Sequence, residues 1–254
     1  MTQTWNEWVF DVNGFPITAR YTQENINEIF RPFLKKLTEM QKASGRRLIV
    51  FLAAPPATGK STLVNFLSWY SANDPELTDV QSVGLDGFHY HQDYILTHDA
   101  VQPDGSVLPM KKVKGSPETY DVAHFIDKAR ELREESHVTL WPEYSRKLHD
   151  VIEDQIPVTG KIVLVEGNWL LFQDERWGHV RDLADYTVFI SAKEESLRGR
   201  LIERKMKGGL TREEAEEFYR TGDGVNVRRT LAGSSDGDLT LLLDSEGVFH
   251  RKKA

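Results

Sequence analysis

Residues 51–64 read "FLAAPPATGKSTLV", an aliphatic run that leads directly into the tetrapeptide "GKST". Loops that bind phosphate follow the pattern G-x-x-x-x-G-K-S/T between a strand and a helix, where backbone N–H groups and the helix dipole favour an anion. The second half of that pattern is complete here, whereas Ala54 stands at the position of the first glycine and two prolines lie inside the loop. The stretch therefore predicts a phosphate loop, with an ordinary strand–helix turn as the alternative.

The flanking residues favour the phosphate loop. "RRLIVFLAA" (46–54) has the continuous apolar pattern of a strand buried on both faces, and "STLVNFLSWYSA" (61–72) has helical periodicity. We expect Lys60 to reach the β- and γ-phosphates of ATP, Ser61 to hold Mg²⁺ and Thr62 to contact the α-phosphate. The predicted ATP-binding residues of the loop are Pro56, Ala57, Thr58, Gly59, Lys60, Ser61 and Thr62.

Two acidic residues lie at the ends of two further apolar runs. Asp86 directly follows "VQSVGL" (80–85), and Glu166 ends "KIVLVE" (161–166). Because ligands of open α/β sheets bind beyond the carboxyl ends of the strands, we expect both acids to face the same crevice as the phosphate loop. In a phosphoryl transferase, one acid deprotonates or orients the accepting hydroxyl, which suits Asp86, and a second acid positions Mg²⁺, which suits Glu166. The alternative is that each acid merely caps the next helix.

The composition restricts the class of protein. The chain has 254 residues, a formal net charge of −7 and no cysteine. The negative charge disfavours a nucleic-acid partner, since phosphate neutralisation needs a basic surface, and the lack of cysteine excludes disulfides and a catalytic thiol. We expect no secretory signal in "MTQTWNEWVFDVNG" and no membrane span, because no apolar run approaches about 20 residues. These features predict a cytoplasmic enzyme that acts on small molecules.

The order of the apolar runs predicts an α/β fold with a mostly parallel sheet, because strands alternate with helices. Residues 24–43 have helical spacing, so residues 1–45 are predicted to form a helical extension of a single domain, 1–254. Residues 93–118 have no steady period and are interpreted as an irregular insertion that faces the substrate. The remaining predicted strands are 186–190 and 239–243, and the remaining predicted helices are 120–135 and 193–219.

Five segments carry a resemblance to a known family, in this order: "PPATGKSTL", "LDGFHYH", "KGSPETYD", "PEYSR" and "VLVEGNWLLF". Over residues 46–245 the chain resembles the P-loop kinases of the phosphoribulokinase, uridine kinase and pantothenate kinase family. "EGNWLLF" and "GGLTREEAEEF" are most similar to its fructose-transport-kinase-like branch. Ala54 and Ala57 stand where members of the family commonly have glycine.

The resemblance implies a three-layer P-loop NTPase fold of the nucleoside-kinase type, with a mobile lid. It also implies ATP and Mg²⁺ as cosubstrate and cofactor, and a small hydroxyl compound as the acceptor. By its place in "DGFH", Asp86 matches the catalytic base of the family, and Glu166 matches the acid of its "EG" motif.

A cationic helical face follows the predicted strand at 186–190. Arg200 and Arg204 are four residues apart and Lys207 is three further on, so all three lie on one side of a helix. Such a face suits a lid, residues 197–222, that closes over ATP and excludes water from the transferred phosphoryl group. We expect Arg200 to bind ATP and Arg204 to act in catalysis on the transferred charge. The alternative is a solvated helix whose cations pair with nearby acids.

Four side chains are expected to face the acceptor: His89, Tyr120, Tyr144 and Arg146. Arg146 offers a bidentate fork to an anionic group, and His89 offers a hydrogen bond. The alternative for Tyr144 and Arg146 is a surface turn with a structural ion pair. A transition-metal site at His89 and His91 is disfavoured, because alternate residues of an extended chain point to opposite sides.

The predicted function is transfer of the γ-phosphoryl group of ATP to a hydroxyl of a sugar, a nucleoside or a pantothenate-like metabolite. The alternative is a P-loop regulatory protein that binds or hydrolyses ATP and has no small-molecule acceptor. The predicted partners are ATP and the acceptor, with no nucleic acid and no membrane. "WNEWVF" (5–10) is expected to pack against either the core or a partner, so a homodimer is a further hypothesis.

Overall fold

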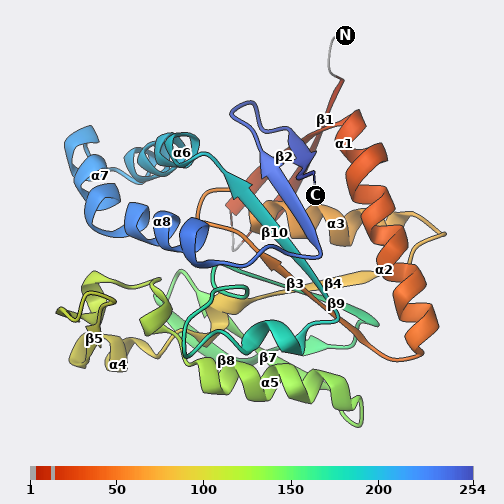
Figure 1. Cartoon of the computed structure of the whole chain (residues 1–254), viewed down its shortest axis with the longest axis horizontal. Coiled ribbons are helices and arrows are strands. Elements are labelled where there is room, and N and C mark those ends of the chain that lie inside the picture. Colours follow the sequence, from red (N-terminus) through yellow and green to blue (C-terminus); the bar gives the residue numbers. More distant parts are fainter. Residues whose placement is uncertain (1–3, 13–14, 254) are drawn as a thin grey trace.

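The computed structural model of the chain describes residues 4–12 and 15–253. Residues 1–3, 13–14 and 254, which are parts of the predicted domain and its extension, lie outside the described residues. Within the described residues, no helix combines the length and the apolar character needed to cross a membrane. The described chain forms a central sheet with helices on both of its faces (Figure 1).

The central sheet has the strand order β12-β11-β10-β3-β9-β4. Edge strand β12 runs antiparallel to β11, and the other neighbouring pairs are parallel, so the predicted mostly parallel α/β sheet is confirmed. Its strands are β3 (Leu48–Ala53), β4 (Val80–Gly84), β9 (Ile162–Gly167), β10 (Tyr186–Ala192), β11 (Leu239–Leu243) and β12 (Phe249–Arg251). Because these strands are parallel, the carboxyl ends of β3, β4 and β9 meet at one edge.

Each face of the sheet is covered by a separate hydrophobic core, because side chains alternate along β3. Val50 packs on the side of α2 (Arg31–Ser44) and α3 (Lys60–Asn73). Phe51 packs on the other side, with α5 (Val122–Glu134) and three buried tryptophans. Figure 1 shows α2 and α5 on opposite sides of the sheet. Burial of both faces accounts for the continuous apolar pattern of β3 in the sequence.

The N-terminal segment differs from the predicted helical extension. Strand β1 (Trp5–Val12) pairs antiparallel with β2 (Phe15–Thr22), so the prediction of helix is wrong for this part. The physical reason is a period of two residues: Trp8 and Phe10 pack against the core, whereas Val9 between them is 69% exposed. Of the two expected ways of packing for this aromatic segment, the structure shows the one against the core.

Helix begins only after this hairpin. The short α1 (Gln23–Asn25) passes through a π-helical turn at Ile26–Phe30 into α2, and Pro32 lies in the first turn of α2. Proline has no N–H with which to bond the carbonyl of Glu28 four residues earlier. Arg251 donates to that carbonyl instead, at 3.2 Å. The predicted N-terminal helix is thus confirmed, with an irregular turn just before the proline.

Several shorter elements have no periodic signal in the sequence. The predicted irregular insertion at 93–118 contains most of α4 and a small hairpin, β5–β6. The predicted helix at 193–219 is two helices, separated near Gly209, which has a φ of +99°. The elements not yet named are α4 (Gln92–Thr97), β5 (Asp99–Val101), β6 (Val107–Pro109), β7 (Thr139–Ser145), β8 (Asp150–Val158), α6 (Glu194–Lys207), α7 (Arg212–Phe218) and α8 (Gly224–Gly233).

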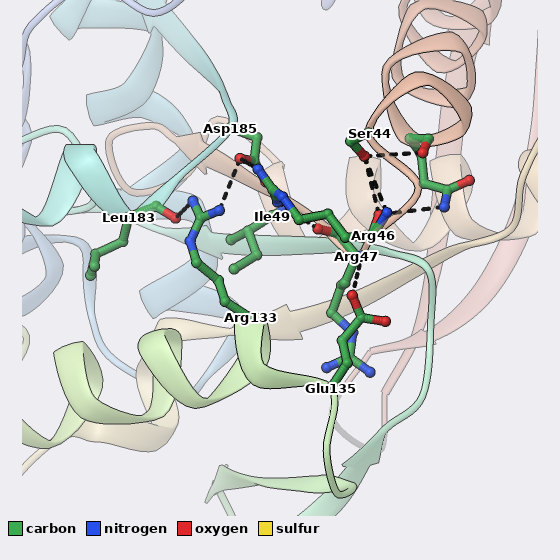
Figure 2. A network of polar contacts seen from close by, with 9 residues as sticks. Ser44, Arg46, Arg47, Ile49, Arg133, Glu135, Leu183 and Asp185 are labelled. Atoms are coloured by element: carbon green, nitrogen blue, oxygen red, sulfur yellow. Dashed lines mark hydrogen bonds and ion pairs between the residues drawn. The ribbon is translucent and has the colours of Figure 1, made fainter.

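A polar network joins α5 to the amino ends of β3 and β10 (Figure 2). The phosphate loop follows the opposite, carboxyl end of β3. Asp185 accepts hydrogen bonds from Arg46 at 2.7 and 3.0 Å and from Arg133 at 3.1 Å. It also accepts one from the backbone N–H of Ile49, at 2.8 Å. Burial raises the pKa of Asp185, but the hydrogen bonds from Arg46 and Ile49 outweigh it and leave the pKa below its ordinary value. The network therefore depends on an ionised carboxylate.

Candidate active site

The phosphate loop lies between β3 and α3. Gly59 has a φ of +85° and Ala57 a φ of +67°, both in the left-handed region that favours glycine. Ala54 does not have a positive φ, so alanine is compatible with the position of the first glycine. The Thr58 hydroxyl donates to the Pro55 carbonyl at 2.9 Å within the loop. No side chain in the described part of the protein caps α3, so the N–H groups of its first turn are left for an anion.

Glu166, at the carboxyl end of β9, faces the start of α3. The Ser61 hydroxyl donates to Glu166 Oε1 at 2.6 Å, and Lys60 Nζ lies 3.8 Å from Glu166 Oε2. The Glu166 side chain is only 14% exposed. This burial raises the pKa of Glu166 above its ordinary value, and the Lys60 ammonium opposes the rise. A carboxylate and a hydroxyl beside an anion-binding turn are the oxygen ligands that suit Mg²⁺ bound together with phosphate.

Asp86 lies in the 3₁₀ turn Leu85–Phe88, directly after β4. The Tyr120 hydroxyl donates to Asp86 Oδ1 at 3.1 Å, and His89 Nδ1 lies 2.9 Å from the Asp86 carbonyl oxygen. The His89 ring also packs on the Tyr120 ring, with centroids 3.9 Å apart. Burial raises the pKa of Tyr120 and lowers the pKa of His89, so both side chains are held in their neutral forms. A neutral pair thus supports the Asp86 carboxylate.

Gly87 allows the β7–β8 hairpin to approach the Asp86 turn. A Cβ atom at Gly87 would lie 2.2 Å from the carbonyl oxygen of Pro142 in β7. Only a residue without a side chain therefore fits between the turn and the strand. This close approach brings Tyr144 and Arg146, which follow Pro142 along the chain, to the cavity that Asp86 lines.

A cavity of about 510 Å³ joins these groups. Asp86 and Glu166 both line it, together with Ser61, Tyr144 and Arg146. The two acids reach the same cavity because β4 and β9 are parallel neighbours, which pairs Gly84 with Glu166. The expected juxtaposition of the two carboxylates is thus present, while the chemical role of each remains a prediction.

Two predicted acceptor residues lie behind the cavity and not on its wall. His89 is 9% exposed and Tyr120 is 1% exposed, and neither lines the cavity. The placement differs from the predicted one because the rings pack in the core below the Asp86 turn. Both side chains contact Asp86, so they hold this residue in position from the core, and a role for them toward the acceptor stays a prediction.

The predicted lid cations occupy different environments. Arg200, on α6, donates to the carbonyl of Ala57 in the phosphate loop at 3.4 Å. Arg204 lies 3.7 Å from Asp223 and its side chain is 55% exposed. Neither Arg200 nor Arg204 lines the cavity. The structure thus places Arg200 at the loop and Arg204 away from it.

The cavity wall also holds residues that the sequence analysis missed. Asp11 comes from β1, Asn65 from α3 and Lys147 from the turn after β7. The spacing of Asn65 four residues after Ser61 was a usable signal, since both face one side of α3. No pattern marks Asp11 or Lys147. Within the described ranges, no three or more His, Cys, Asp or Glu side chains gather as a metal site. A cation here would depend on Ser61, Glu166 and bound phosphate.

Comparison with known proteins gives matches along most of the chain, although no family model matches it. The chain is 41% identical to "Uncharacterized protein YggC" of Escherichia coli (strain K12), over 94% of this chain and 96% of that protein. It is 28% identical to "Putative uridine kinase C227.14" of Schizosaccharomyces pombe, over 72% of this chain and 77% of that protein. The crystal structure of a "putative fructose transport system kinase" from Silicibacter sp. TM1040 is similar, with a TM-score of 0.67 and 25% identity. That similarity covers 80% of this chain and 98% of the other.

Proposed function

The chain belongs to the P-loop kinases of the phosphoribulokinase, uridine kinase and pantothenate kinase family, and we propose that it transfers the γ-phosphoryl group of ATP to a hydroxyl of a small metabolite. The observation that carries the proposal is the single cavity onto which Asp86 and Glu166 both open, next to Ser61 at the start of α3. A sugar, a nucleoside and a pantothenate-like alcohol are the acceptor classes considered.

In this proposal the phosphate loop holds the nucleotide. The N–H groups of the first turn of α3 and the Lys60 ammonium bind the phosphates, and Arg200 supports the loop from α6 through the Ala57 carbonyl. Ser61 and Glu166, whose oxygens lie 2.6 Å apart, would hold Mg²⁺. When bound, Mg²⁺ neutralises part of the phosphate charge. Glu166 serves this purpose only when ionised.

Asp86 accepts the proton of the attacking hydroxyl. Its Oδ1 takes the hydrogen bond from Tyr120, which fixes the carboxylate and leaves Oδ2 for the acceptor. The Arg146 side chain lines the same cavity and binds the anionic groups that gather there. Water is kept from the reacting phosphoryl group by the walls of the cavity and by closure of the lid.

We propose residues 197–222 as this lid, in one domain that comprises residues 1–254. Closure brings Arg204 toward the phosphates and therefore breaks its 3.7 Å pair with Asp223. The insertion 93–118 serves the acceptor side through Lys114, whose Nζ lies 4.9 Å from the centre of the Tyr144 ring. A cytoplasmic location and a homodimer stay predictions.

ATP turnover in the presence of candidate acceptors tests the proposed function. The parent protein is expected to release ADP only when an acceptor is present, and Asp86→Asn is expected to lower kcat by about 10²–10⁴ while it binds ATP as the parent does. Lys60→Ala is expected to weaken ATP·Mg²⁺ binding. Hydrolysis that is independent of any acceptor would favour the regulatory alternative. Full activity of Asp86→Asn would remove Asp86 from the role of base.

A further inference from the structure

The segment of residues 115–121 lies against the Asp86 turn. Two backbone hydrogen bonds, of 3.0 and 2.8 Å, join residues 119–121 to residues 88–90 at the end of that turn. From this segment the Tyr120 hydroxyl donates to Asp86 Oδ1 at 3.1 Å. The orientation of the Asp86 carboxylate therefore depends on Tyr120, and the place of Tyr120 depends on how the segment is held.

A buried ion pair connects the same segment to α8. Arg229, on α8, donates hydrogen bonds to both carboxylate oxygens of Glu118, at 2.6 and 2.9 Å. The two side chains are only 14% and 16% exposed. Burial raises the pKa of Glu118, but the hydrogen bonds and the positive charge of Arg229 oppose the rise, and the pKa lies below its ordinary value. The pair is thus a bidentate contact between two charged groups, which fixes direction as well as distance.

Aromatic side chains that follow β9 hold Arg229 in place. The guanidinium lies 5.6 Å from the centre of the Phe172 ring and 5.8 Å from that of the Trp169 ring, within the range of a cation–π contact. The Trp169 indole N–H donates to the carbonyl of Gly115 at 3.0 Å, at the start of the segment. Arg229 therefore links α8 and the chain after β9 to the segment that holds Asp86.

The simpler explanation is an ion pair that only packs α8 against the domain. Burial of two charges is costly, however, and two apolar side chains of similar size often stabilise a protein as well or better. An apolar pair lacks direction, whereas the bidentate pair allows few relative positions of its partners. Since the segment also carries Tyr120, this directional contact acts on the Asp86 carboxylate.

From this chain of contacts we propose that Glu118 and Arg229 are positioning residues for the proposed base. They fix the segment 115–121 and, through the Tyr120 hydroxyl, orient the Asp86 carboxylate toward the acceptor. Neither Glu118 nor Arg229 lines the cavity that Asp86 lines, so they act through Tyr120 and not by contact with a substrate. The inference rests on the kinase function proposed above and adds two residues on which its catalytic geometry depends.

Hydrogen exchange of the backbone amides, followed by mass spectrometry on the full chain, tests the positioning without any acceptor. Arg229→Met removes the guanidinium, and Glu118→Gln keeps the shape of the side chain but not its charge. In both variants we expect exchange in residues 86–91 and 116–121 to become at least about tenfold faster, while exchange in β3 stays unchanged. Glu118→Gln is the milder change and decides the question if thermal melts show that Arg229→Met does not fold.

Arg133→Met is the matched control. It removes an arginine that also donates to a carboxylate, that of Asp185, but at the amino ends of the strands. This variant should lower the melting temperature and leave both kcat and exchange in residues 86–91 unchanged. Unchanged exchange in residues 86–91 and 116–121 of Glu118→Gln, or an equal rise in β3, overturns the positioning role.

A double-mutant cycle on kcat tests whether the pair acts through Tyr120. The acceptor is the one among D-fructose, D-ribose, uridine and pantothenate that gives the fastest release of ADP. Tyr120→Phe and Glu118→Gln should each lower kcat about tenfold to hundredfold and leave the KM for ATP unchanged. In the Tyr120→Phe background, Glu118→Gln should lower kcat by less than about threefold, because both changes release the same carboxylate.

An equal effect of Glu118→Gln on kcat in both backgrounds overturns the path through Tyr120. Release of ADP that no acceptor increases in the parent protein overturns the kinase proposal itself. The exchange measurement then still decides whether the ion pair holds the Asp86 turn, so the two failures are distinguishable.

Discussion

Replacing Gly87 by alanine tests why the Asp86 turn and the β7–β8 hairpin meet. The added Cβ would lie 2.2 Å from the carbonyl oxygen and 2.6 Å from the carbonyl carbon of Pro142, more than about 1 Å inside ordinary contact. Both atoms belong to the backbone of β7, at its irregular position between Trp141 and Glu143, so neither can rotate away as a side chain does and the strand must shift locally. Overpacking costs about 1–3 kcal/mol, and we expect a loss of about 3 kcal/mol in the free energy of unfolding.

Gly84→Ala is the matched control from the same segment. A Cβ there meets nothing closer than 3.9 Å, and Gly84 has a φ of −106°, so the change should stay within about 0.5 kcal/mol. Urea unfolding of the parent and both variants measures the difference, and kcat of the folded protein shows whether the displaced hairpin also disturbs the cavity. If Gly87→Ala unfolds at the same urea concentration as Gly84→Ala, close approach does not hold the hairpin in place and the reasoning is refuted.

Two further predictions concern pH. Burial raises the pKa of Glu166, so the carboxylate is protonated as pH falls through that raised pKa, and kcat/KM should fall with it. The Ser61→Ala variant loses a hydrogen bond that stabilises the carboxylate. Its fall in kcat/KM should therefore begin at a higher pH than that of the parent. A profile unchanged by Ser61→Ala would contradict this. The lowered pKa of Asp185 means that its stabilising contribution is present above the pKa of the unfolded chain and disappears as pH falls through the folded value. Asp185→Asn should therefore cost about 2 kcal/mol at neutral pH and much less in acid, as measured by urea unfolding; an equal loss at both pH values would argue against an ionised Asp185.

The elements predicted well are those whose signal lies in neighbouring residues. The continuous apolar run of β3 and the tetrapeptide that begins at Gly59 specify a strand, a tight loop and the start of a helix within residues 48–62. Asp86 and Glu166 were found in the same way, because each lies at the end of a strand. Parallel pairing then brings them together as a consequence of sheet topology.

The prediction failed where elements are short or where packing decides the outcome. The helical extension predicted for residues 1–45 is wrong for β1, in which Trp8 and Phe10 alternate with exposed residues as in a half-buried strand. His89 and Tyr120 were expected to face the acceptor, and the structure instead buries both rings against Asp86, while their role toward an acceptor stays a prediction. Residue type and motif order contain no information about which side of a turn a ring occupies.

The sequence by itself determined the phosphate loop, the α/β class and the two acids, since each depends on the local chain and on rules of strand order. Only the tertiary structure decided the cavity, because Asp11 and Arg146 line it from segments that lie 135 residues apart in the sequence. Aromatic packing on α3 places the hairpin that carries Asp11. The close approach at Gly87 places the hairpin that carries Arg146. Local patterns record which conformation a segment prefers. Contacts between distant segments depend on how side chains fill the space between them, which no single segment encodes.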